Sequence, residues 1–211
     1  MHDRPVIKVP YRADIPSAEE WAAIPSYSMA LSHDRVGIPQ EGGTVRFAWN
    51  SEGIIVRAEL TDSCLISTNR HDEQLHYQCG DVFELFLKPL NAPYKWEMYA
   101  TPYGNKSTLF FPTWPTTLTV EESLRHHNLR GLNVSVETTS TGWTAQMSVP
   151  AADLTAMGMG WGAGFEWTAF CGRYNCNQED LKNPELSMFP AASATNYHLT
   201  DEYAILDFLT T

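Results

Sequence analysis

The sequence predicts an all-β protein, an antiparallel β-sandwich with long loops and one or two short helices. Apolar and polar side chains alternate with period two in most of its regular segments, as expected for half-buried β-strands. Helical patterns are few and short. The strand patterns also do not alternate with helices along the chain, so the parallel sheets of βαβ proteins are not expected.

The first clear strands form a hairpin. Residues 44–49 precede the turn Asn50-Ser51-Glu52-Gly53, and residues 54–60 follow it with Arg57 and Glu59 on one face and apolar side chains on the other. The same reasoning predicts further strands at residues 82–87, 94–100, 132–138, 144–149, 165–173 and 203–208.

Helices and loops complete the predicted architecture. Ser17-Ala18-Glu19-Glu20 forms a capping box for a short helix that ends before Pro25, and residues 151–157 predict another helical turn. Three long connections, at 62–80, 103–130 and 174–202, exceed the usual length of structureless loops, and loops of that length are usually functional or mobile. No repeat or low-complexity linker divides the chain, so residues 1–211 are expected to form a single domain.

Composition narrows the classes of partner. The 211 residues include 14 Lys and Arg against 25 Asp and Glu, a net charge of −11, which disfavours nucleic acid and anionic membrane surfaces. Aromatic residues make up 12% of the chain, enough for a rich core or for stacking on a ligand. The start of the chain lacks the apolar segment of a signal peptide, which predicts a cytoplasmic protein; if the chain has been trimmed, an extracellular location is the alternative.

Glu84 is the first residue that the strand pattern does not explain. Both faces of its strand are otherwise apolar, and an unpaired carboxylate in such surroundings costs several kcal/mol or takes up a proton. The carboxylate of Glu84 therefore needs hydrogen-bond donors. These could come from a ligand or from a buried ion pair, for which Arg173 is the candidate.

Several segments resemble the family-9 carbohydrate-binding modules, in the order expected for that family and over nearly the whole chain. The resemblance is carried by Asp81 to Leu87 (DVFELFL), Tyr94-Lys95-Trp96-Glu97, Gly142 to Pro150 (GWTAQMSVP), Trp167 to Arg173 (WTAFCGR) and Tyr197 to Leu206 (YHLTDEYAIL). It implies a jelly-roll-like sandwich, related to DOMON domains, that grips mono- or oligosaccharides without cleaving them. Members of the family often accompany glycoside hydrolases in carbohydrate catabolism. No cofactor is required, although some members carry a structural calcium ion.

The resemblance also implies a set of sugar-contacting residues. Tyr77 and Tyr197 stand where the family places stacking aromatics, Glu84 where it places a sugar-binding glutamate, and Arg173 and His198 where it places an arginine and a histidine. This set suits a sugar, because rings pack on its C–H face and charged groups bond its hydroxyls. Trp96 and Trp114 are further candidate platforms, and Glu97 replaces an expected arginine. The full candidate set is Tyr77, Glu84, Trp96, Glu97, Arg173, Tyr197 and His198.

Other functions remain open at this stage. A haem-binding DOMON-like domain would need axial ligands, for which Met98 and His198 are the best pair. A glycosidase would use Glu84 and Glu97. A protein-interaction sandwich would use the aromatic loops to bury a partner. No zinc spacing is present. The resemblance allows a calcium ion held by loop carboxylates such as Asp62, without assigning its ligands.

Overall fold

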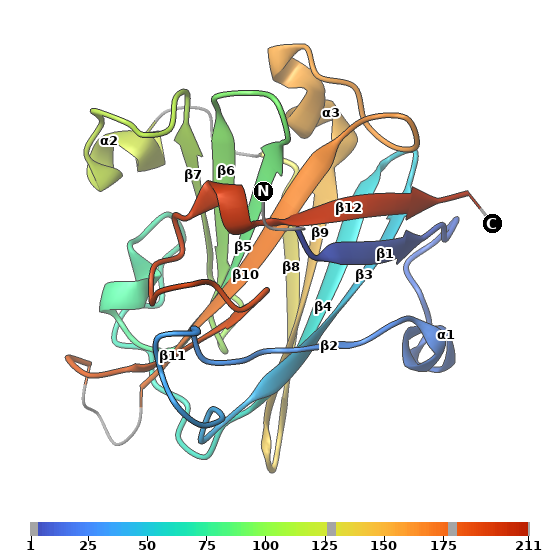
Figure 1. The fold of residues 1–211 in the computed structure, drawn as a ribbon. Helices are drawn as coiled ribbons and strands as arrows, with labels where there is room; N and C mark the ends of the chain where they lie inside the picture. The colour runs from blue at the N-terminus through green and yellow to red at the C-terminus, as the bar shows by residue number, and fades with distance from the viewer. Residues whose placement is uncertain (1–3, 126–129, 177–180, 211) are drawn as a thin grey trace.

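Two β-sheets face each other in the structure, a computed structural model that describes residues 4–125, 130–176 and 181–210 (Figure 1). This confirms the predicted β-sandwich. Within these residues one sheet has the order β1-β12-β10-β5-β6-β7, with β11 paired to β10, and the other has the order β2-β3-β4-β9-β8. Every pairing is antiparallel except that of β1 with β12.

The two sheets contain twelve strands among the described residues. The larger sheet contains β1 (Val6–Pro10), β5 (Val82–Pro89), β6 (Lys95–Ala100), β7 (Lys106–Phe111), β10 (Trp167–Asn175), β11 (Glu185–Phe189) and β12 (Ala204–Leu209). The smaller sheet contains β2 (Tyr27–Ser28), β3 (Gly43–Asn50), β4 (Gly53–Thr61), β8 (Asn133–Thr139) and β9 (Gly142–Pro150). The helical elements are α1 (Ala18–Ala23), α2 (Val120–Arg125), α3 (Ala151–Leu154), η1 (His76–Gln78), η2 (Thr155–Met157) and η3 (Thr200–Glu202).

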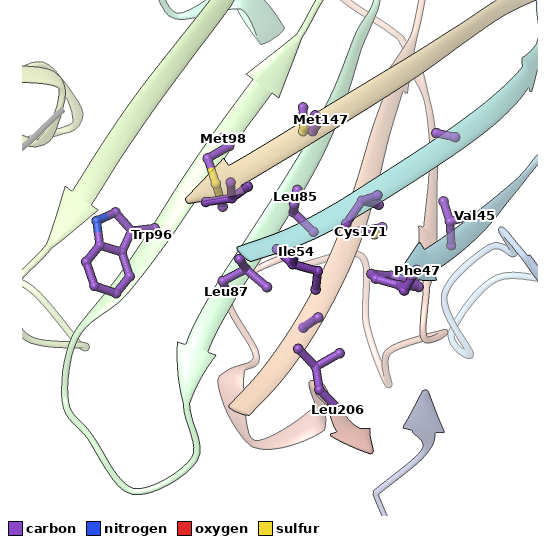
Figure 2. Close-up of a cluster of buried hydrophobic side chains, with 14 of the residues drawn as sticks. Val45, Phe47, Ile54, Leu85, Leu87, Trp96, Met98, Met147, Cys171 and Leu206 are labelled. Carbon is purple, nitrogen blue, oxygen red and sulfur yellow. The ribbon is translucent and has the colours of Figure 1, made fainter. Parts of the chain in front are cut away.

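The main core lies between the sheets. Because side chains alternate across each strand, every second residue of β3, β4, β5, β9 and β10 enters it. Figure 2 shows part of this cluster, with Phe47, Ile54, Leu85, Met147 and Cys171 from five different strands. The four cysteines, all among the described residues, are free thiols, so no disulfide cross-links the core.

The outer face of the larger sheet is also covered. Two further apolar clusters lie on it, one around Phe86, Phe170 and Tyr203 and one around Val82 and Leu109. Side chains from η1, from the segment before and within α2, and from the segment before β12 pack against these clusters. Figure 1 shows η1, α2 and η3 on the same side of the molecule. Both faces of β5, β6 and β10 are therefore buried, which explains the nearly continuous apolar sequence of β5.

The helix prediction near the start is confirmed, and the loop predictions need correction. In α1 the Ser17 hydroxyl accepts from the backbone N–H of Glu20, whose carboxylate accepts from the N–H of Ser17. The connection at 103–130 contains β7 and α2, the one at 174–202 contains β11 and η3, and the one at 62–80 contains η1. Residues 126–129 and 177–180 of these connections lie outside the described residues. Among the described helices, none is both long and apolar enough to cross a membrane.

Candidate functional site

Three neighbouring strands provide the floor of a pocket on the outer face of the larger sheet. Strand β5 lies between β10 and β6, and Glu84 is paired with Gly172 on one side and with Tyr99 on the other. Glu97 is two residues before Tyr99 on β6 and therefore points to the same face. The strand alternation thus brings two carboxylates and a bare glycine backbone together.

Loops from three parts of the chain form the walls of this pocket, which has a volume of about 270 Å³. This is close to the lower end of the range for small-molecule sites, about 300–1,000 Å³. Two carboxylates (Glu84 and Glu97) and His198 line it together with six aromatic rings: Tyr77, Tyr99, Phe111, Trp114, Tyr174 and Tyr197. Its remaining described lining residues are Thr116, Leu118 and Val120. The combination of rings with a few polar groups is typical of a site for a small polar ligand.

Glu84 is buried in the floor without a protein partner for one of its oxygens. Its exposed fraction is 3%, and Oε1 has no hydrogen-bond partner among the described residues. Burial, reinforced by the nearby charge of Glu97, raises the pKa of Glu84 well above its usual value, while Lys95 opposes the rise. Arg173 does not form the ion pair with Glu84 that the sequence left open. The unmatched oxygen is available to a ligand donor.

Glu97 is, by contrast, fully engaged by the protein. Its Oε1 lies 2.7 Å from Nζ of Lys95 and 3.2 Å from Nδ1 of His198, and its Oε2 accepts from the Tyr99 hydroxyl at 3.2 Å. Burial alone would disfavour ionisation, but the charge of Lys95 and the bond from His198 outweigh it and lower the pKa of Glu97 to about 2. Neighbouring carboxylates in one pocket therefore have opposite tendencies to hold a proton.

Trp114 and His198 form one rim of the pocket. Their rings stack with centroids 4.8 Å apart and planes 30° apart, and the indole N–H of Trp114 donates to the backbone carbonyl of His198. Nζ of Lys95 lies 4.0 Å from the centroid of Trp114 and 2.7 Å from Nδ1 of His198. The rim is therefore tied to the floor through the lysine that also holds Glu97.

Tyr197 and Tyr77 differ in how they contribute to the walls. Tyr197 is buried, its hydroxyl lies 2.7 Å from the carbonyl of Arg173 and 2.9 Å from that of Ser187, and its ring covers Gly172. Tyr77 is half-buried and lies 5.6 Å from the ring of Tyr174, measured between centroids. Tyr77 is the freer platform, whereas Tyr197 is a fixed wall.

The structure brings five of the seven candidate residues into this pocket: Tyr77, Glu84, Glu97, Tyr197 and His198. Their contact with sugar stays a prediction. Trp96 is a correction: it is adjacent to Glu97 in β6, so it points to the other face and packs in the main core beside Trp167. Figure 2 shows Trp96 and Met98 among the side chains of that buried cluster.

Arg173 is the second correction, for the same geometric reason. It follows Gly172 in β10 and is fully buried on the opposite side of the sheet. Its guanidinium donates to the backbone carbonyls of Glu41, Gly42 and Thr61 and to the side chains of Asp62 and Asn175. Arg173 therefore ties the end of β10 to the smaller sheet and does not line the pocket.

Sequence reasoning missed Lys95, Tyr99, Phe111, Gly172 and Tyr174 as parts of the site or its support. A signal was present for two of them, since Lys95 and Tyr99 flank Glu97 at two-residue spacing and must share its face. Gly172 and Tyr174 could be found only from the register of β10 against β5, which local sequence does not specify.

The geometry does not fit haem or calcium at the positions expected. Met98 points into the core between the sheets and His198 lies at the pocket rim, on opposite sides of β6, so they cannot both bind one iron. Oδ2 of Asp62 accepts from the indole of Trp143 and from Arg173, so a guanidinium takes the position of a cation there. Within the described part of the chain, no group of three or more His, Cys, Asp or Glu could hold a metal ion.

No protein-family model and no curated protein sequence matches the chain. Solved structures do match. A proposed carbohydrate-binding protein from Bacteroides uniformis has a TM-score of 0.72 at 12% identity, covering 98% of this chain and 100% of that one. A family-9 carbohydrate-binding module from Caldicellulosiruptor kristjanssonii gives 0.68 at 10% identity in complex with glucose, covering 97% of this chain and 96% of the module. A structure of a family-9 module from the same organism in complex with cellotriose gives a TM-score of 0.67 at 11% identity, covering 96% of this chain and 92% of that one. The chain therefore has the same fold as these modules.

Proposed function

We propose that this protein is a non-catalytic carbohydrate-binding module that holds a small sugar, or the end of a glycan, in the pocket above β5, β6 and β10. The observation that carries the proposal is the buried oxygen of Glu84 that lacks a donor in an aromatic pocket. A sugar hydroxyl would satisfy this oxygen, and the C–H face of the ring would pack on the tyrosines. The fold shared with modules solved in complex with glucose and cellotriose supports the same function.

The role of each residue follows from its contacts. Glu84 would accept from a hydroxyl, Tyr77 would provide the accessible stacking face, and Tyr197 would limit the depth of the pocket. His198, held by Trp114, would bond the outer rim of the sugar. We further propose that the protein serves carbohydrate catabolism, together with a glycoside hydrolase.

Isothermal titration calorimetry with glucose, cellobiose and cellotriose tests the proposal. Because the pocket is small, we expect weak binding, with Kd between about 1 μM and 1 mM. Glu84→Gln should weaken it at least tenfold, and Glu137→Gln, which changes an exposed carboxylate of the other sheet, should leave it unchanged. Flat heats for a broad sugar panel would favour a protein-interaction role instead.

Hydrolysis is the second candidate, and one observation favours it. Burial raises the pKa of Glu84, whereas the pKa of Glu97 is lowered because Lys95 and His198 outweigh its burial, and such a divergence is what an acid and a nucleophile need. However, both oxygens of Glu97 are bonded to protein donors, which argues against a free nucleophile. Release of reducing sugar from a polysaccharide panel that disappears in Glu97→Gln would contradict the non-catalytic assignment.

A further inference from the structure

We propose that the pocket prefers an amino sugar, whose protonated amine pairs with Glu84 while its ring lies against the aromatic walls. This inference rests on the sugar-binding function proposed above and specifies the class of sugar. The observation behind it is geometric: of the two carboxylates in the floor, Glu97 is ion-paired with Lys95, whereas Oε1 of the buried Glu84 has no partner among the described residues.

The lysine of the floor is already committed. Nζ of Lys95 lies 2.7 Å from Oε1 of Glu97, and both side chains are almost fully buried. Among the described residues, no basic side chain forms an ion pair with Glu84. Within the described part of the chain, Glu97 has a counter-ion and Glu84 has none.

His198 contacts Glu97 and Lys95 and does not pair with Glu84. Its Nδ1 lies 2.7 Å from Nζ of Lys95 and 3.2 Å from Oε1 of Glu97, so its polar contacts are with that pair. The other titratable groups that interact with Glu84 are phenols, whose ionisation would only add negative charge: Tyr77 on η1, Tyr99 on β6, Tyr174 on β10, Tyr197 and Tyr203. Among the described residues, none therefore pairs an opposite charge with Glu84.

The walls suit a cation. Six aromatic rings line the pocket, and an ammonium within about 6 Å of a ring centroid is attracted by the negative face of the ring. The pocket already shows this contact, because Nζ of Lys95 lies 4.0 Å from the ring centroid of Trp114 and 4.9 Å from that of Phe111. The net charge of −11 on the whole chain also attracts cations to the surface.

An amino sugar matches these features better than a neutral sugar does. A hydroxyl gives Glu84 one hydrogen bond, whereas an ammonium gives a hydrogen bond and the opposite charge in a desolvated site. Because burial raises the pKa of Glu84, the empty site keeps a proton to higher pH than a free carboxyl does, and a bound ammonium would displace that proton. Binding of an amino sugar should therefore release protons, and binding of a neutral sugar should not.

Calorimetry on the full chain with D-glucosamine, D-glucose and N-acetyl-D-glucosamine tests the inference. At about pH 6, where the amine of glucosamine is protonated, we expect it to bind at least tenfold more tightly than glucose. N-acetylglucosamine, which carries no charge, should show no such gain. Titration in two buffers of different ionisation enthalpy should show up to about one proton released per glucosamine, and none per glucose.

Two Glu→Gln variants test whether the preference for an amino sugar depends on the charge of Glu84. Glu84→Gln keeps the size of the side chain and should reduce the affinity ratio of glucosamine to glucose to about one, whereas Glu137→Gln should preserve the ratio. Glucose binding equal to or tighter than glucosamine would overturn the amino-sugar preference and leave the sugar-binding proposal intact. Choline, a cation without a sugar ring, is titrated as well. If the chain binds choline but none of the three sugars, both proposals fail. Both also fail if the chain binds none of these compounds.

Discussion

The ring of Tyr197 lies against the bare backbone of Gly172, so closely that a β-carbon built at Gly172 would come within 2.4 Å of Cε2 of the ring. Gly172 is also the partner of Glu84 across β10 and β5. The missing side chain at this position therefore lets the tyrosine reach the carboxylate, and it fixes the depth of the pocket.

Gly172→Ala should displace Tyr197 and damage both stability and binding. The hydroxyl of Tyr197 is bonded to the carbonyls of Arg173 and Ser187, so the ring cannot move away freely. We expect the free energy of unfolding to fall by about 1–3 kcal/mol, measured by urea denaturation, and sugar binding to weaken. Gly42→Ala, where an added β-carbon meets nothing within 4 Å, is the matched control. A Gly172→Ala variant as stable as the control would show that the ring adjusts.

Glu97→Gln should destabilise the protein by removing the counter-ion of a buried lysine. Breaking a buried ion pair from one side costs about 3–5 kcal/mol. The pKa of Glu97 is lowered to about 2, mainly because Lys95 outweighs the effect of burial, so its contribution to stability is present above the unfolded pKa of about 4.3. That contribution is lost as the pH falls toward 2. The wild type and the variant should therefore converge in acid, and a difference that stays constant down to about pH 2 would contradict this.

Glu84→Gln should have the opposite effect at neutral and alkaline pH. The folded protein holds a proton on Glu84 that the unfolded chain releases above about pH 4.3, so rising pH lowers the stability of the wild type until the raised pKa is passed. The difference amounts to about 1.4 kcal/mol for each pH unit in that window. The variant should unfold at higher urea concentration than the wild type at about pH 8, with the difference shrinking toward pH 4. Glu137→Gln should show no such trend, and a Glu84→Gln variant that behaves like it would remove the buried-carboxyl argument.

Arg173→Lys should affect the fold and leave the pocket intact. One ammonium cannot replace the guanidinium bonds to three backbone carbonyls, Asp62 and Asn175, so we expect a loss of about 2–4 kcal/mol in the free energy of unfolding. The affinity of the folded protein for its sugar should change less than twofold, as measured by calorimetry. A large loss of affinity at unchanged stability would show that Arg173 contributes directly to sugar binding.

Much of the sandwich could be predicted from local sequence, because one-sided burial produces the period-two pattern read in β3, β4 and β9. The missed strands lack that signal for physical reasons. Strand β7 is buried on both faces and ends in three consecutive apolar residues, so it does not alternate. Strand β1 pairs with β12 at the other end of the chain, a contact that no local pattern reports.

The candidate site was predictable in part. Glu84 was found because a carboxylate in an apolar strand demands a partner. Strand parity already places Trp96 and Glu97 on opposite faces, so both could not belong to one pocket. The position of Arg173 depends on the register between β10 and β5, and the wall from Trp114 to Val120 depends on how a long connection folds back. The position of Arg173 and the position of this wall both depend on tertiary contacts, which the local sequence does not specify.

The floor and the walls of the pocket belong to different parts of the architecture. Every floor strand carries core side chains on its reverse face, so its backbone is held by the packing of the whole sandwich. Tyr77, Trp114 and His198 sit on three separate connections outside that packing. New ligand preferences can thus be engineered by diversifying these three positions together, while the scaffold that presents the acidic floor stays untouched.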